Sequence, residues 1–173
     1  MKFVFPDVNY KEKAIDFINE FYEYSSEISG SGSLMRYLSE SSYEEWLKKV
    51  LSDIDIANIP AERVPELTYF YVDDTDKIVG IINIRLQLNH FLRTEGGHIG
   101  YSVRPTERGK HYATDMLSKA LKFCKRIGLN EVIITCDKSN PASAKVITSN
   151  GGVLDAEFYS DTFGEIIQRY TIK

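Results

Sequence analysis

The sequence predicts an α/β fold, and two observations carry that prediction. Apolar runs rich in Val, Ile and Tyr alternate along the chain with segments whose apolar residues recur at helical spacing. One unit, residues 97–136, reads strand, loop, helix, strand, which is the arrangement of two parallel strands joined by a helix. The chain has 173 residues, of which 43% are hydrophobic, and can bury one sizeable core but not two large ones. We therefore expect a single domain over residues 1–173.

The first third of the chain predicts one strand and two helices. Residues 2–5 form a short apolar run, and Asn9 with Glu12 three positions later is the pattern of a helix start. A second amphipathic segment covers residues 46–54. Between the two helices, residues 25–33 are rich in Ser and Gly and predict a flexible connection.

Two further pairs of strands flank the central unit. Residues 68–72 and 78–86 are joined at Asp73-Asp74-Thr75-Asp76, whose composition is typical of a hairpin loop. At the other end of the chain, residues 152–159 and 166–172 predict a second hairpin.

The loop inside the central unit predicts an anion site. A strand ends at a turn marked by Pro105, and a basic loop that contains Gly109 opens directly onto an amphipathic helix, which Gly128 ends before the apolar strand 131–136. The first N–H groups of such a helix have no partner within it, and the positive end of the helix dipole lies behind them. This arrangement suits a phosphate group.

A second helix start follows the apolar strand 131–136. Asn140 is a favoured N-cap residue, and Pro141 stands at the favoured first helical position. The helix ends at Asn150, which two glycines follow.

These two segments resemble the GCN5-related N-acetyltransferase (GNAT) family. Residues 108–113, Arg-Gly-Lys-His-Tyr-Ala, resemble its acetyl-CoA pyrophosphate loop, in which Arg or Gln, two residues, Gly, one residue, and Gly or Ala follow one another. His111 occupies the place of the central Gly, and His is among the non-Gly residues that best tolerate a positive φ. Asn140, Ser143 and Gly151 reproduce the family's spacing around the helix that flanks the pantetheine arm, but Ile147 stands where a Tyr often protonates the leaving thiolate.

The resemblance implies a fold, a co-substrate and a set of contact residues. The fold would be a mixed, mostly antiparallel twisted sheet of about six or seven strands flanked by about four helices, with an acetyl-CoA-binding core at about residues 97–152. Acetyl-CoA would be the acetyl donor, and the resemblance implies no metal. The residues implied in cofactor binding are Ser102, Val103, Arg108, Gly109, Lys110, His111, Tyr112, Ala113, Asn140 and Ser143.

Catalytic candidates come from the strand before the loop. Gly97-His98-Ile99-Gly100-Tyr101 is similar to a family strand in which a Glu precedes Ile-Gly-Tyr, so His98 is the candidate base, with a half-buried structural His as the alternative. Tyr101 is a candidate acid, and Ser143 and Tyr159 are alternatives to it. Cys124 and Cys136 fall in apolar segments and predict reduced core residues, so we expect no acetyl-cysteine intermediate.

The resemblance implies an acyltransferase that transfers groups other than aminoacyl groups, with a small-molecule or peptide amine as acceptor. The connection over residues 25–37 would form part of the acceptor wall. A module of the same fold that binds CoA without catalysis stays open as the alternative, because of His111 and Ile147. Family members are often dimers, so the resemblance allows a homodimer.

Composition excludes other classes of function. A net charge of −4 gives no electrostatic footprint for nucleic acid. We find no apolar stretch that could span a bilayer and no signal peptide, and we expect a cytoplasmic protein. The three histidines do not have the spacing of a zinc site.

Overall fold

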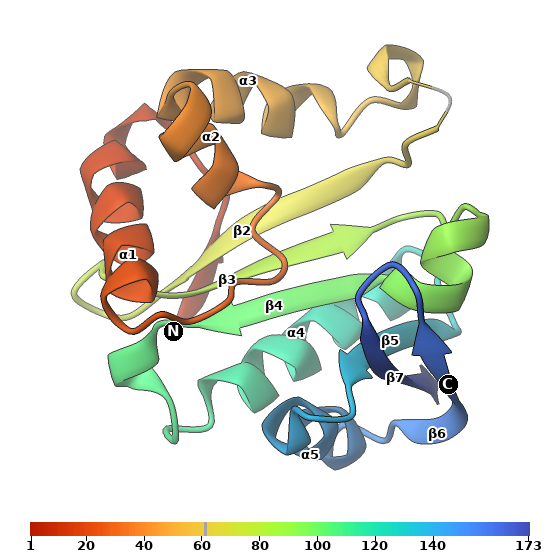
Figure 1. Cartoon of the computed structure of the whole chain (residues 1–173). Helices are drawn as coiled ribbons and strands as arrows, with labels where there is room; N and C mark the ends of the chain where they lie inside the picture. The colour runs from red at the N-terminus through yellow and green to blue at the C-terminus, as the bar shows by residue number, and fades with distance from the viewer. Residues whose placement is uncertain (61) are drawn as a thin grey trace.

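Two β-sheets form the centre of the structure, a computed structural model that describes residues 1–60 and 62–173. The first sheet is antiparallel, and its strand order is β1 (Lys2–Val4), β2 (Glu66–Val72), β3 (Ile78–Arg85) and β4 (Ile99–Val103). The second is also antiparallel, in the order β5 (Val132–Asp137), β7 (Glu165–Ile172) and β6 (Val153–Ser160). Figure 1 shows the two sheets side by side, with β4 and β5 at the boundary between them.

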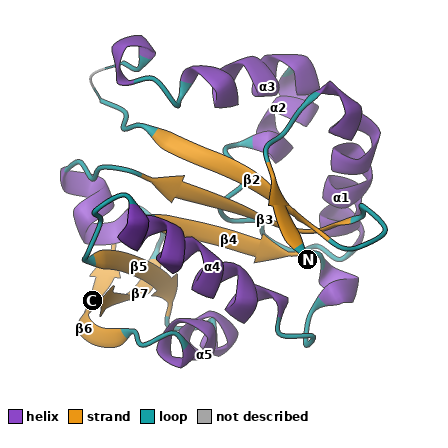
Figure 2. Cartoon of the chain, turned by 180° about the vertical axis from the view of Figure 1, so that it is seen from behind, coloured by secondary structure: helices purple, strands orange, loops and turns teal. Residues whose placement is uncertain are grey.

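Helices cover both faces of the first sheet. One face carries α1 (Lys11–Glu23), α2 (Leu34–Glu40) and α3 (Tyr43–Ser52), and the opposite face carries α4 (Tyr112–Arg126), as Figures 1 and 2 show. The fifth helix, α5 (Pro141–Ser149), packs beside α4. Four short turns, η1 to η4, lie at Val8–Tyr10, Ile56–Asn58, Leu92–Gly96 and Pro105–Glu107, and η3 is a π-helical turn.

The alternation of side chains along β2 and β3 explains why both faces are apolar. Phe70 and Ile81 point into the core beneath α1 to α3, whereas Tyr71 and Ile82 point into the core beneath α4, and all four are fully buried. Successive strand residues face opposite sides of a sheet, so a strand that is buried on both faces reads as a continuous apolar run. This arrangement positions α4 and the loop before it at the end of β4.

Trp46 fixes the Ser/Gly-rich connection between α1 and α2. Its indole Nε1 donates to the carbonyl oxygens of Ser31 and Gly32, at 3.2 and 3.0 Å, and its ring is fully buried. The connection is therefore held against α3 by two hydrogen bonds from this buried indole.

The structure confirms the α/β fold, and the strands and helices that the sequence predicts are present within a few residues. It differs at the first helix start, because Asp7 caps the chain by accepting from the Asn9 N–H at 2.7 Å and α1 begins only after the turn η1. It also adds α2, a seven-residue helix in which Leu34, Tyr37 and Leu38 stand at helical spacing and pack against the core. The expected single sheet is divided into two.

In the described part of the chain, no helix is both long enough and apolar enough to cross a membrane.

Candidate functional site

The site lies where β4 and β5 separate. The two strands meet near their first residues, where the His98 N–H donates to the Ile133 carbonyl oxygen at 2.7 Å. Beyond this contact they belong to different sheets, and no pairing joins them among the described residues. An opening therefore forms between the later parts of β4 and β5.

His98 holds the closed end of this opening. Its Nδ1 accepts a hydrogen bond from the Ile133 N–H at 2.9 Å, and the residue is only 6% exposed. Burial, the largest cause, lowers the pKa of His98 from its ordinary value. Since Nδ1 is occupied as an acceptor, the neutral ring carries its proton on Nε2 and has no free lone pair for a substrate proton. This geometry favours a structural role for His98.

Backbone groups line the opening on both sides. The hydrogen bonds Arg104 N–H to Val79 O and Arg85 N–H to His98 O fix which residues of β4 face β3. Because facing alternates along an antiparallel strand, Tyr101 and Val103 direct their backbone groups away from β3 and into the opening.

The same rule separates the two β4 residues that the sequence singled out. Ser102 directs its backbone groups to β3, and its Oγ exchanges hydrogen bonds with the backbone of Ser29 at 2.8 and 2.9 Å. Of this pair, only Val103 presents its backbone to the opening. On β5, the bond from Lys138 N–H to Ile166 O places the backbone of Thr135 on the opening as well.

The loop before α4 presents a row of free donors. None of the backbone N–H groups of residues 109–114 has a hydrogen-bond partner among the described residues, and the first paired one, Asp115, donates to the His111 carbonyl oxygen at 3.1 Å. No side chain caps the helix start. With the dipole of a 15-residue helix behind them, these groups have the arrangement that favours an anion.

Two left-handed residues shape this loop. Gly109 has φ +78° and His111 has φ +62°, so His111 adopts the conformation that its place in the loop requires. His tolerates this region better than most residues do, which is what the sequence predicts for this substitution of the usual Gly. Arg108 anchors the loop by donating to the Ser26 hydroxyl at 2.7 Å and to the Val103 carbonyl oxygen at 3.3 Å.

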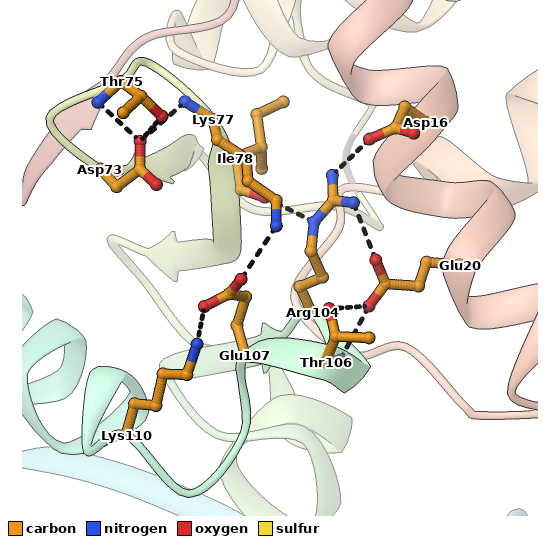
Figure 3. A network of polar contacts seen from close by, with 10 residues as sticks. All are labelled: Asp16, Glu20, Asp73, Thr75, Lys77, Ile78, Arg104, Thr106, Glu107 and Lys110. Carbon is orange, nitrogen blue, oxygen red and sulfur yellow. Dashed lines mark hydrogen bonds and ion pairs between the residues drawn. The ribbon is translucent and has the colours of Figure 1, made fainter.

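A buried arginine fixes the base of the loop. Arg104 is 3% exposed and donates to Glu20, Asp16 and the Ile78 carbonyl oxygen at 2.8 to 2.9 Å. Figure 3 shows this guanidinium between α1 and the end of β4, with Glu20 also accepting from Thr106. The end of β4 is thereby tied to α1, and the pKa of Glu20 is lowered because the hydrogen bonds from Thr106 and Arg104 outweigh its burial.

Asn140 and Ser143 lie where the sequence predicts. The Asn140 Oδ1 accepts from the Ser143 N–H at 3.0 Å and caps α5. The Ser143 hydroxyl lies 3.0 Å from the Tyr101 hydroxyl, so β4 and α5 touch across the opening. Burial raises the pKa of Tyr101 to about 12. Ile147 is fully buried and has no group that could donate a proton.

The α1–α2 connection crosses β4 at close range. A Cβ on Gly30 would lie 2.0 Å from the Gly100 carbonyl oxygen, and Gly30 has φ +69°. No side chain fits between the two segments. The connection therefore lies directly beside β4, where the predicted acceptor wall would stand.

Acidic groups gather at the far end of β5, and sequence reasoning missed them. The pKa of Asp137 is raised, mainly by burial and further by the charges of Glu165 and Glu27. These residues come from β5, β7 and the α1–α2 connection. The position of Asp137 at the end of an apolar strand was the one signal in the sequence, because Glu27 and Glu165 are far from it in the chain.

The cysteines are free and buried, and burial raises the pKa of both thiols to about 11, so neither is an activated nucleophile. Within the described residues, no group of three His, Cys, Asp or Glu side chains could hold a metal ion.

The sequence matches the family described as acetyltransferase (GNAT) domain over residues 18–153. No curated protein matches it. Solved structures do, among them RimL, a ribosomal L7/L12 alpha-N-protein acetyltransferase in complex with coenzyme A, with 15% identity and a TM-score of 0.72 over 98% of this chain and 92% of that one.

Two further solved structures match the chain over almost its whole length. The microcin C7 self-immunity acetyltransferase MccE, in complex with acetyl-CoA and AMP, has 18% identity and a TM-score of 0.70 over 98% of this chain and 90% of that one. A chimera of the spermidine N-acetyltransferase SpeG from Vibrio cholerae and hSSAT has 16% identity and a TM-score of 0.65 over 99% and 95%. At these identities the likeness shows the fold.

The left-handed conformation of His111 predicts a selective response to substitution. His111→Val places a β-branched residue at a positive φ and should lower the free energy of unfolding by about 1–2 kcal/mol, whereas His111→Gly should not lower it by that mechanism. Urea denaturation measures both. His90→Val, at an exposed position without positive φ, is the control, and an equal loss in His90→Val and His111→Val would contradict the prediction.

The lowered pKa of His98 predicts a pH-dependent stability. Because its folded pKa lies below the ordinary value of 6.5, the unfolded chain takes up this proton first, and the stability present above about pH 6.5 is lost as the pH falls toward the folded pKa. His98→Asn retains an acceptor for Ile133 but does not titrate. Its unfolding free energy should fall less between pH 7.5 and 5.5 than that of the wild type, and equal falls would count against the assignment.

Proposed function

Since the chain belongs to the GNAT acetyltransferase family, and is therefore an acyltransferase, we propose that it transfers an acetyl group directly from acetyl-CoA to a primary amine of a small molecule or a peptide. One observation carries the proposal. The opening between β4 and β5 ends beside a row of free N–H groups at the start of α4. An extended ligand could therefore lie in the opening and place a phosphate group at these N–H groups.

Acetyl-CoA would extend from the start of α4 into the opening between β4 and β5. Its pyrophosphate would be bound by the N–H groups of residues 109–114, which include those of Gly109, Lys110, His111, Tyr112 and Ala113. The Arg108 and Lys110 side chains already contact protein groups, so the backbone would supply most of the donors. The pantetheine arm would then hydrogen-bond the Val103 backbone and pass Asn140 and Ser143, which takes the thioester into the opening.

The acceptor amine must lose a proton before it attacks. An alkyl amine has a pKa near ~10 and is mostly protonated at neutral pH. His98 is poorly placed to take this proton, because its Nδ1 is bonded to Ile133 and burial disfavours its charged form. We therefore propose Asp137 as the base, directly or through a water, because its raised pKa makes the carboxylate a better proton acceptor.

The leaving thiolate of CoA needs a hydrogen-bond donor rather than a general acid whose pKa matches that of the thiol. With a pKa of about 12, Tyr101 stays protonated at neutral pH and holds its proton more tightly than a thiol, whose pKa is near ~8.5. Tyr101, paired with Ser143, would therefore act as a hydrogen-bond donor to the thiolate or to the tetrahedral oxyanion. Backbone N–H groups on the opening would supply the remaining donors.

The charges around the opening favour a cationic acceptor. The charges of Glu165 and Glu27 contribute to the raised pKa of Asp137, so these carboxylates repel one another. A second positive charge on the acceptor would relieve that repulsion. The structural relatives include a spermidine acetyltransferase and a ribosomal-protein acetyltransferase, so both a small molecule and a peptide stay open as the acceptor.

A module that binds CoA without turnover is the second candidate, and Ile147 favours it, because this buried side chain has no hydroxyl to protonate a thiolate. The decisive experiment measures free CoA release from acetyl-CoA with a panel of diamines, monoamines and peptides with free N-termini. We expect turnover that is highest with acceptors that carry a second positive charge. Saturable acetyl-CoA binding without turnover on any acceptor would instead establish the binding module.

Two variants separate the proposed roles of Asp137 and Tyr101. Asp137→Asn should lower kcat by about 10²–10⁴-fold and remove the fall of the rate on the acid side of the pH profile. Tyr101→Phe should lower kcat without changing that pH dependence. Tyr22→Phe, at an exposed position, is the control and should leave both unchanged. An acid limb that survives in Asp137→Asn would remove Asp137 as the base.

A further inference from the structure

A cavity of about 320 Å³ lies between α4 and the outer strands of the first sheet, away from the opening between β4 and β5. In Figure 2, α4 lies across one part of this face of the sheet and leaves β2 uncovered. The lining of the cavity includes Phe3, Tyr69 and Phe123, with Lys119, Lys122 and Arg126. We call this cavity the α4 groove. Its volume is within the range of small-molecule sites.

Aromatic rings form the walls of the α4 groove. Phe3 on β1 and Tyr69 on β2 have ring centroids 5.8 Å apart, and Phe123 faces them from α4. All three are half-buried, so their bodies are fixed by packing while part of each ring stays accessible. The Tyr69 hydroxyl has no hydrogen-bond partner among the described residues and is not one of their buried unpaired polar atoms, so it is accessible to a ligand.

Cations form the rim. Lys119 is neutralised, since its Nζ contacts the Asp115 carboxylate and the Tyr71 hydroxyl, each at 2.8 Å. Lys122 and Arg126 have no carboxylate partner within the described part of the chain, and the one contact of Arg126 is from Nε to the Lys122 carbonyl oxygen at 3.3 Å. No acidic side chain lines the groove. A protein with a net charge of −4 thus has a local positive site here.

We infer that the α4 groove binds a free mononucleotide. A planar base offers a π-face to the aromatic walls and ring nitrogen acceptors to the Tyr69 hydroxyl. A phosphate matches the two unneutralised cations, of which Arg126 has a guanidinium suited to bidentate contact. The volume fits one nucleotide rather than a longer chain, and the groove has no acid to repel the phosphate.

The groove is separate from the proposed cofactor loop. Lys122 lies ten residues beyond Tyr112, the first residue of α4, which corresponds to about 15 Å along a helix. The inference therefore does not depend on the proposed acetyl transfer, and binding at the groove can be measured with the cofactor site filled.

Calorimetric titration of the full chain, saturated with CoA, with adenosine 5′-monophosphate tests the inference. We expect one saturable site, with weaker binding of adenosine and of inorganic phosphate, because each offers only half of the contacts. Arg126→Gln should weaken nucleotide binding about tenfold or more, as loss of a charge-assisted hydrogen bond implies, and Tyr69→Phe should weaken it less. Lys125→Gln is the matched control, since Lys125 lies on the same helix and does not line this groove.

Three results would overturn the inference: no saturable binding of the mononucleotide, equal weakening by Arg126→Gln and Lys125→Gln, or binding of a single-stranded oligonucleotide without binding of the mononucleotide. Circular dichroism of each variant confirms that it is folded. The acetyl-transfer assay reports on the other site, so the two proposals can fail separately.

Discussion

The contact between His98 and Ile133 is the constraint on which the geometry of the site depends. Two hydrogen bonds join β4 to β5 at one end, and beyond them the strands continue in separate sheets. A sheet that stayed paired along its whole length would satisfy its backbone groups internally and offer none to a ligand. Because the pairing stops, the backbone of Val103 and that of Thr135 are left to face an opening. A ligand with amide groups can satisfy them.

The start of α4 depends on a different set of interactions. The free N–H groups are useful only if the loop is held still, and charged residues hold it. Arg104 ties the end of β4 to α1, and Glu107 accepts from Lys77 and Lys110 at 2.9 and 2.7 Å, as Figure 3 shows. These ion pairs leave the backbone donors unoccupied, so the loop is fixed without losing its capacity to bind an anion.

The sequence predicts the parts of the site that are local in the chain. The loop at residues 108–113 and the Asn140 cap are short segments, and their turn and capping preferences act within a few residues. The sequence left the role of His98 open between a base and a structural His, because the choice depends on Ile133, which is 35 positions away. Asp137 was missed for a similar reason, since two of the charges that affect it come from distant segments. The division of the sheet into two could not be predicted either, because no residue pattern in the sequence marks where the pairing between β4 and β5 stops.

The approach of Gly30 to Gly100 limits how the proposed acceptor wall can change. A Cβ on Gly30 would lie 2.0 Å from the Gly100 carbonyl oxygen, and one on Gly100 would lie 3.1 Å from the Gly30 backbone, so the α1–α2 connection is held close against β4. Insertions or substitutions elsewhere in the connection can reshape the wall of the opening while this point of contact stays in place. For laboratory evolution toward new acceptors, residues 27–29 are therefore the segment to diversify, with Gly30 and Gly32 kept constant, because a Cβ on Gly32 would lie 2.8 Å from the Thr68 hydroxyl oxygen.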